Sequence, residues 1–392
     1  MQAFDLSAPA SSMPRSGIRA FMDLAWTAGD VIHLEVGEPN FPTPPHIVEA
    51  AARAARNGQT KYVANAGVAE LREAIADKIR RSNGYVASRD DVVVTAGGVQ
   101  ALYLSMLALV EPGDGVLVPD PGWPNFRMIA TLLNGVVQPY RLRAAQEYQP
   151  CIEDLDAATT SSTKVLILNS PSNPLGSVMT AARISEILEW SRDRGIWIIS
   201  DECYDEIVFD ESFVSPRSLG SPENVIACYS FSKTYSMTGW RVGYAVAGRA
   251  DVRDSLAKLQ EPLISCVSAP VQAAAVAALR GPQEVVTDMR DAYLARRDAA
   301  VLALRSAKKV DVLVPSGAFY LWLDTSPWVA DDWALATAML DQAGVAVAPG
   351  SAFGAGGAGF VRISLATEMP VLLDGIGRIL AFLDSTRQQA AG

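Results

Sequence analysis

Short apolar runs alternate with helical patterns along residues 46 to about 282. Runs such as VVVT (92–95), VLILN (165–169) and WIISD (197–201) are too short for helices, and polar or glycine-bearing loops follow them. The segments between them, such as ALYLSMLALV and AARISEILEW, are helical in pattern. Parallel strands need crossover connections and are buried on both faces, so this alternation predicts an α/β fold with a mostly parallel sheet covered by helices on both faces.

The chain is expected to form three parts. Residues 1–45 are rich in Pro, Gly and Ser and end in GEPNFPTPP, where regular structure is excluded, so we expect an N-terminal arm and small-domain segment. Residues 46–282 form the expected large domain. A long helical pattern, VVTDMRDAYLARRDAAVLALRS, follows GPQE, and shorter mixed segments come after it. We therefore expect a smaller α+β domain at 283–392.

Composition narrows the class of partner. With 392 residues, 49% of them hydrophobic and 19% charged, the chain is too long for one ordinary core and is not disordered. The apolar content favours a large core or a buried subunit interface, and we expect an oligomer. A net charge of −10 opposes binding to nucleic acid or to an anionic membrane surface. Small molecules are the expected partners.

The four cysteines show no CxxC spacing, and only His33 and His46 could join them as metal ligands, so no metal site is expected. Scattered cysteines in apolar settings are typical of reduced core residues, which indicates the cytoplasm. No basic-then-apolar leader and no 18-residue apolar run is visible, so neither secretion nor a membrane span is expected.

The stretch SFSKTYSMTGWRVGY, residues 230–244, contains the main candidate chemistry. Lys233 follows the apolar run NVIACYSF, and burial at a strand end favours its neutral amine, the form that makes a Schiff base with an aldehyde. The alternative is an ordinary surface lysine. Arg241, Ser230 and Ser232 supply donors suited to a phosphate.

A second anion site is expected at TAGGVQ. Gly97 and Gly98 allow a tight turn, and the helix that starts near Val99 directs free N–H groups at an anion. The GxGxxG spacing of a dinucleotide site is absent. Asp201 and Tyr204 place an acid and a phenol at one strand end, although Asp201 could instead cap a helix, and Trp123 could instead be a core residue.

Eleven segments, in this order, resemble the class I/II aminotransferases, which are fold-type I pyridoxal-phosphate enzymes of the aspartate aminotransferase superfamily. The resemblance extends from about Met13 to Leu383. The segments are SGIRAF, LEVGEPNFPTP, KYVANAGVAELREAIA, VTAGG, PDPGWPNF, NSPSNPLG, SDECYDEIVF, SFSKTYSMTGWRVGY, SGAFYLWLD, VAVAPGSAFG and FVRISLA.

The resemblance implies a seven-stranded, mostly parallel sheet sandwiched by helices, a smaller α+β domain, and the cofactor pyridoxal 5'-phosphate. Lys233 would hold the cofactor as an imine and then move the proton between Cα and C4′. Asp201 would pair with the pyridine nitrogen, and Tyr204 would bind the ring 3-oxygen. The remaining implied cofactor contacts are Gly98, Val99, Trp123, Asn173, Ser230, Ser232 and Arg241, with Tyr62 reaching the phosphate of the neighbouring subunit in a homodimer.

For the substrate, the resemblance implies that Arg362 binds the α-carboxylate with help from Asn173 and the Gly37 backbone. Without the motif, Arg362 would be an ordinary surface arginine. Relatives selective for acidic substrates carry lysine at the Val99 position or a basic residue before the small domain. This chain has neither, since no Lys or Arg occurs between Lys258 and Arg280.

We therefore expect a neutral, apolar or aromatic amino donor, because an unpaired second carboxylate would be costly to bury. The expected pocket walls are Ile18, Phe21 and Trp123. The predicted activity is transfer of an amino group to a 2-oxo acid by a ping-pong mechanism. The alternatives are another fold-type I outcome, namely a β-lyase, decarboxylase or oxidase, and a non-catalytic sensor that binds the cofactor.

Overall fold

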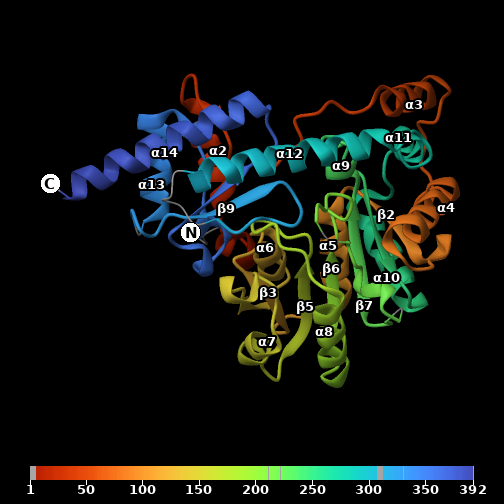
Figure 1. Cartoon of the computed structure of the whole chain (residues 1–392). Coiled ribbons are helices and arrows are strands. Elements are labelled where there is room, and N and C mark those ends of the chain that lie inside the picture. The colour runs from red at the N-terminus through yellow and green to blue at the C-terminus, as the bar shows by residue number, and fades with distance from the viewer. Residues whose placement is uncertain (1–5, 211, 221, 307–311, 330, 392) are drawn as a thin grey trace, which may run out of the picture.

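The computed structural model describes residues 6–210, 212–220, 222–306, 312–329 and 331–391. Its largest element is a seven-stranded sheet with the strand order β2-β8-β7-β6-β5-β3-β4 (Figure 1). The strands are β2 (Val92–Thr95), β3 (Gly115–Asp120), β4 (Val136–Arg141), β5 (Thr163–Asn169), β6 (Trp197–Asp201), β7 (Val225–Ser230) and β8 (Gly243–Ala247).

The sheet is mostly parallel. Only β8 runs antiparallel to its neighbours β2 and β7, while β7, β6, β5, β3 and β4 pair in parallel. The predicted α/β class and the mostly parallel sheet are confirmed. The hydrophobic pattern did not reveal β4, because this edge strand is only partly buried and carries exposed residues such as Val136.

Helices cover both faces of the sheet, and the side chains of each strand alternate between the two layers. Val93 of β2 packs with α5, α6 and α10, whereas Val92 and Val94 pack with α3, α4 and α11 on the opposite face. The helices around the sheet are α3 (Pro45–Arg56), α4 (Ala69–Lys78), α5 (Gly98–Leu109), α6 (Asn125–Leu132), α7 (Ile152–Ala158), α8 (Ala181–Asp193), α9 (Phe231–Thr234), α10 (Ala250–Ile264) and α11 (Ala269–Arg280).

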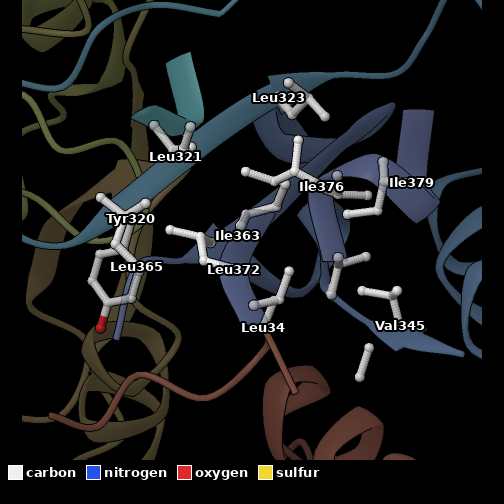
Figure 2. Packing of buried hydrophobic residues seen from close by; sticks show 14 of the residues in the cluster. Leu34, Tyr320, Leu321, Leu323, Val345, Ile363, Leu365, Leu372, Ile376 and Ile379 are labelled. Carbon is white, nitrogen blue, oxygen red and sulfur yellow. The ribbon is translucent and has the colours of Figure 1, made fainter. Parts of the chain in front are cut away.

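A second group of elements surrounds a separate hydrophobic core (Figure 2). Strands β9 (Tyr320–Asp324), β12 (Phe360–Ser364) and β11 (Ala348–Pro349) form an antiparallel sheet, and β1 (Ile32–His33) pairs in parallel with β10 (Val345–Ala346). Helix α12 (Glu284–Ser306) reaches from the neighbourhood of α11 to that of α14 (Figure 1). The other helices are α1 (Ala8–Ser12), α2 (Gly17–Thr27), α13 (Asp332–Ala338) and α14 (Met369–Ala391).

The N-terminal 45 residues contain more regular structure than an arm. Helix α2 begins after Ser16, whose side chain accepts a hydrogen bond from the Arg19 backbone, and it buries Phe21 and Ala25 against the second core. Strand β1 joins the same part of the molecule through β10. The predicted division at residues 45 and 282 stays a prediction. Among the described residues, no helix is both long enough and apolar enough to cross a membrane.

A buried ionic cluster fixes the segment that follows β6. Lys78, at the end of α4, forms ion pairs with Asp205 and with Glu206, the latter at 3.0 Å, and it donates to the Asn83 side chain at 2.9 Å. Asn83 in turn donates to Asp205 at 2.8 Å. Because Asp201 and Tyr204 precede these carboxylates, the cluster ties the strand end that carries them to α4.

Replacing Lys78 should therefore destabilise the protein. Lys78→Met leaves the buried Asp205 carboxylate without its cation, at an expected cost of about 3–5 kcal/mol, and should lower the urea midpoint of the loss of far-UV circular dichroism. Lys258→Met, on an exposed position of α10, is the matched control and should cost less than about 0.5 kcal/mol. Equal midpoints for the two variants would contradict a stabilising role of the cluster.

Candidate active site

A cavity of about 450 Å³ lies where the carboxyl ends of the sheet strands meet α2, β9 and β12. This is the usual ligand position in open α/β sheets. The predicted site residues that line it are Ile18, Gly37, Gly98, Val99, Trp123, Asn173, Asp201, Tyr204, Ser230, Ser232, Lys233, Arg241 and Arg362. Residues from distant parts of the sequence therefore meet in one cavity.

Lys233 is presented by the short helix α9 directly after β7, and its side chain faces the cavity. Its amine donates to the Gly37 carbonyl at 2.5 Å. Burial lowers the pKa of Lys233 from its usual 10.5 to about 8, and the Arg362 and Arg241 guanidinium groups act in the same direction, while Cys203 and Glu38 oppose them. The structure thus holds a lysine with an unusually accessible neutral form.

The anion site combines a helix start with one arginine. Gly97 has φ +86°, and a Cβ added there would overlap the Arg241 guanidinium. Arg241 itself has φ +54° and is held by the Thr238 carbonyl at 2.9 Å. Ser230 accepts from the Ser232 backbone at 3.1 Å. The N–H groups at the start of α5, the hydroxyls and the guanidinium lie around one end of the cavity, as a phosphate requires.

Asp201 is the last residue of β6 and lines the cavity, and it is 4% exposed. Burial raises the pKa of its carboxyl to about 6, and hydrogen bonds from Cys203 limit that rise. The Cys203 backbone donates to Asp201 at 3.2 Å. No ion pair to Asp201 exists in the described part of the chain, so a cationic ligand group would find a desolvated acceptor there.

Arg362 on β12 is almost fully buried and faces the same cavity. It donates to the Asn173 side chain at 2.9 Å and to the Glu35 carbonyl at 2.6 Å. Its Nε is buried and has no hydrogen-bond partner among the described residues. Burial lowers the pKa of Arg362. A buried guanidinium with an unused donor is suited to a carboxylate ligand.

Tyr204 and Trp123 complete the set predicted for the cofactor ring. Tyr204 is 3% exposed, and its hydroxyl lies 2.8 Å from that of Tyr320. Burial raises the pKa of Tyr204 well above its usual value, which keeps the phenol protonated. Trp123 lines the cavity and also packs edge-on against Phe126, with ring centroids 5.6 Å apart. Both the ligand-facing and the core interpretations of Trp123 describe part of its environment.

One predicted wall residue is wrong. Phe21 is fully buried in the second core and packs edge-on against Trp333, away from the cavity. Because residues three or four apart share a face of α2, Ile18 and Met22 line the cavity, whereas Phe21 and Ala25 face the core.

Tyr62 lies outside the cavity. It follows α3 in a loop and is 87% exposed. The single chain therefore does not bring Tyr62 to the site, and its predicted role depends on a second subunit.

Several residues that line the cavity were not identified from the sequence, although all of them except Met22 and Leu102 belong to the quoted segments. Asn169 opens NSPSNPLG, Tyr320 belongs to SGAFYLWLD, and Arg19 belongs to SGIRAF. Arg19 and Met22 reach the site because α2 is a helix, whereas the Pro, Gly and Ser content of residues 1–45 predicted an arm. The others are Ser16, Val36, Glu38, Leu102, Asn125, Cys203 and Thr238.

The side chains of this cavity fit pyridoxal phosphate. The Lys233 amine matches its aldehyde, and the isolated buried Asp201 carboxylate matches its ring nitrogen. The anion site matches its phosphate, because Gly97 and Gly98 have no side chains of their own there and leave room for Arg241. Within the described ranges, no group of three or more His, Cys, Asp or Glu side chains is arranged to hold a metal ion.

Known proteins are similar to this chain along nearly its whole length. The family model for aminotransferase class I and II matches residues 29–376. A probable aspartate/prephenate aminotransferase of Aquifex aeolicus is 40% identical over 363 residues, which cover 91% of this chain and 91% of that protein.

Solved structures of similar proteins have the same fold. The aspartate aminotransferase from Thermus thermophilus with maleate matches with a TM-score of 0.91 and 34% identity, covering 97% of this chain and 100% of that one. The aromatic aminotransferase from Pyrococcus horikoshii OT3 matches with a TM-score of 0.89 and 34% identity, covering 94% and 99%.

The lowered pKa of Lys233 makes a pH prediction. With a pKa of about 8, about a tenth of the amine is neutral at pH 7, roughly 300-fold more than in an ordinary lysine. Acetylation of Lys233 in the apoprotein, followed by mass spectrometry, should therefore level off above about pH 8, whereas a lysine model compound should keep gaining rate up to pH 10.5. Parallel pH profiles would refute the burial effect.

A second prediction concerns the anion site at Gly97 and Arg241. In Gly97→Ala the new methyl group displaces Arg241, and the dissociation constant of pyridoxal phosphate should rise about tenfold or more, as expected for the loss of a charge-assisted hydrogen bond. Gly58→Ala is the matched control, because Gly58 has φ +77° but no atom within 4 Å of its Cβ position. Fluorescence titration of the two apoproteins gives both constants, and equal weakening would show that backbone strain alone is responsible.

Proposed function

Because the chain belongs to the aminotransferase class I and II family, we propose that it moves an amino group between a neutral, apolar or aromatic amino acid and a 2-oxo acid by a ping-pong mechanism. Family membership itself establishes a pyridoxal-phosphate-dependent aminotransferase. The observation that carries the proposal is that the Lys233 amine and the buried Arg362 guanidinium face the same cavity.

The proposed chemistry assigns one task to each group. Bound pyridoxal phosphate supplies the aldehyde for an amine and the ring that accepts the electron pair of the Cα–H bond. With the cofactor bound, the neutral Lys233 amine would be the base that takes the proton from the substrate Cα and the acid that delivers it. Asp201 keeps the ring nitrogen protonated, and Tyr204 donates to the ring 3-oxygen. Arg241, Ser230 and the start of α5 hold the phosphate.

Arg362 orients the substrate. A bidentate pair between its guanidinium and the α-carboxylate is strengthened by burial and fixes the position of Cα relative to the Lys233 amine. The side chain of Asn173 already holds one end of the guanidinium. Because an amino acid and a 2-oxo acid share this carboxylate, the same arginine serves both half-reactions, which is the basis of the proposed ping-pong mechanism.

Preference for a neutral donor follows from the walls of the cavity. Ile18, Met22, Val99 and Leu102 present apolar surface. Of the four basic side chains that line the cavity, Lys233, Arg241 and Arg362 have assigned tasks. A second substrate carboxylate near the apolar walls would lose its hydration without a partner, which costs several kcal/mol.

We also propose a homodimer with shared active sites. The exposure of Tyr62 leaves its side chain free to reach a neighbouring subunit, and the resemblance assigns it to the phosphate there. Its phenol would add one more donor to the anion site. The cytoplasm is the proposed location, because all four cysteines are free thiols.

A second candidate is a dicarboxylic substrate bound by Arg19. This remaining basic side chain lines the cavity, is exposed, and forms neither an ion pair nor a guanidinium hydrogen bond within the described part of the chain. It lies over the Trp26 ring at 5.9 Å, a weak contact that it could leave. The names of the relatives, aspartate and aspartate/prephenate aminotransferase, favour this candidate.

The donor preference can be measured in single half-reactions of the holoenzyme. Phenylalanine and leucine should convert the cofactor to its amine form at least about tenfold faster than aspartate, since an unpaired carboxylate is disfavoured in the apolar pocket. Oxo acids should then reverse the conversion.

Arg19→Met separates the two candidates, with Arg15→Met as its control. Arg15 lies in the same segment but outside the cavity lining, where it pairs with Asp23. A preference for aspartate that disappears in Arg19→Met and persists in Arg15→Met would replace the neutral-donor proposal with the dicarboxylate one.

A further inference from the structure

Tyr320, the first residue of β9, contacts both the cofactor side and the substrate side of the cavity. It is 1% exposed, and its ring borders the second core while its hydroxyl points away from the labelled aliphatic side chains (Figure 2). That hydroxyl lies 2.8 Å from the Tyr204 hydroxyl. The Tyr320 ring lies 4.3 Å from the guanidinium carbon of Arg362.

We propose that Tyr320 is a positioning residue that holds the cofactor-facing tyrosine and the carboxylate-binding arginine in a fixed relation to each other. The inference rests on the roles of Tyr204 and Arg362 in the proposed function. The hydroxyl of Tyr320 acts on Tyr204, and the ring of Tyr320 acts on Arg362.

The hydroxyl determines the direction of the Tyr204 hydrogen. Two phenols 2.8 Å apart share one hydrogen bond, in which one donates and the other accepts. If Tyr204 donates to the cofactor 3-oxygen, its lone pairs remain for the Tyr320 hydrogen. Burial raises the pKa of Tyr204 and of Tyr320, so both phenols keep their hydrogens. Tyr320 thereby strengthens the donor that faces the cofactor.

The ring limits the motion of Arg362. The guanidinium carbon lies over the rings of Tyr320 and Phe353, at 4.3 and 4.9 Å from their centroids, while the Asn173 side chain and the Glu35 carbonyl accept its hydrogen bonds. Contact with these aromatic faces opposes rotation of the planar group. The plane of Arg362 is thus set before a carboxylate arrives, which reduces the ordering that binding requires.

Tyr320 also lies against the backbone that contacts the reactive lysine. A Cβ at Gly37 would be 2.5 Å from the Tyr320 hydroxyl oxygen, and the Gly37 carbonyl accepts from Lys233 at 2.5 Å. A residue larger than glycine would separate these groups. Tyr320 therefore occupies the position where three parts of the site meet.

Tyr320→Phe tests the hydroxyl in the holoenzyme, because it keeps the ring. A donor to the 3-oxygen stabilises its negative charge, so a weaker donor should raise the pH midpoint of the change in absorbance of the bound cofactor. We expect Tyr320→Phe to raise it by a few tenths of a pH unit and Tyr204→Phe to raise it further. The KM values of the Tyr320→Phe variant should stay unchanged.

The double variant Tyr204→Phe/Tyr320→Phe shows whether Tyr320 acts through Tyr204. Its midpoint should equal that of Tyr204→Phe alone, since the second hydroxyl has nothing left to act on. Additive shifts would overturn the inference. If Tyr204→Phe itself leaves the midpoint unchanged, both the role of Tyr320 and the assignment of Tyr204 to the 3-oxygen are wrong. The two failures therefore give different results.

Tyr320→Leu tests the ring. Loss of the buried stacking contact should raise the KM of the amino acid and of the oxo acid about tenfold each. The pH midpoint should shift as much as in Tyr320→Phe, because both variants lack the hydroxyl. A KM equal to that of Tyr320→Phe would overturn the part of the inference that concerns Arg362.

Tyr293→Phe is the matched control. Tyr293 belongs to the same core and is fully buried, and its hydroxyl has no hydrogen-bond partner in the described chain. Its removal should leave both the midpoint and the KM unchanged. An equal midpoint shift in Tyr293→Phe would show that any core change moves the cofactor, and would overturn the specific role of Tyr320. Circular dichroism confirms that each variant is folded.

Discussion

The desolvation of one amine is the constraint on which the site depends. Lys233 reaches the cavity because β7 ends there, and burial makes its neutral form available near physiological pH. The same burial would be a liability for an isolated charge, but the Gly37 carbonyl accepts one hydrogen of the amine. The sheet supplies this environment, since neighbouring parallel strands end at one edge and bring Asp201 and Asn169 beside Lys233.

The second half of the site comes from a different core. Arg362 lies on β12 and Tyr320 on β9, which are neighbouring strands of the antiparallel sheet, and Gly37 follows β1. These residues are positioned by the packing of aliphatic side chains such as Leu34 and Ile363 (Figure 2). Groups assigned to the cofactor lie mainly at the strand ends of the large sheet, whereas Arg362, which is assigned to the substrate carboxylate, lies on the small sheet and donates to Asn173 in the loop after β5. The cavity is the surface where the two cores meet.

The sequence predicted the α/β class and the parallel character of the sheet because buried strands such as VLILN have no polar face. It did not reveal β4, whose edge position leaves it half exposed. Polar residues at strand ends were recognisable as candidates, since Lys233 and Asp201 each follow an apolar run. Phe21 and Ile18 could not be assigned to opposite sides without knowing the rotation of α2. Tyr320 was hidden because an aromatic residue in an apolar strand is indistinguishable from core until its hydroxyl partner is known.

Because α2 lines the cavity, the residues that determine the substrate preference lie in a different part of the sequence from those that act on the cofactor. The groups that activate the cofactor come from strand ends and from α5 and α9, where most substitutions would impair turnover of every substrate. One face of a single helix, Gly17–Thr27, supplies much of the remaining wall. Substitutions at Ile18, Arg19 and Met22 could therefore alter the range of accepted amino acids while the catalytic groups stay the same. Such a division lets new specificities evolve without loss of the underlying reaction.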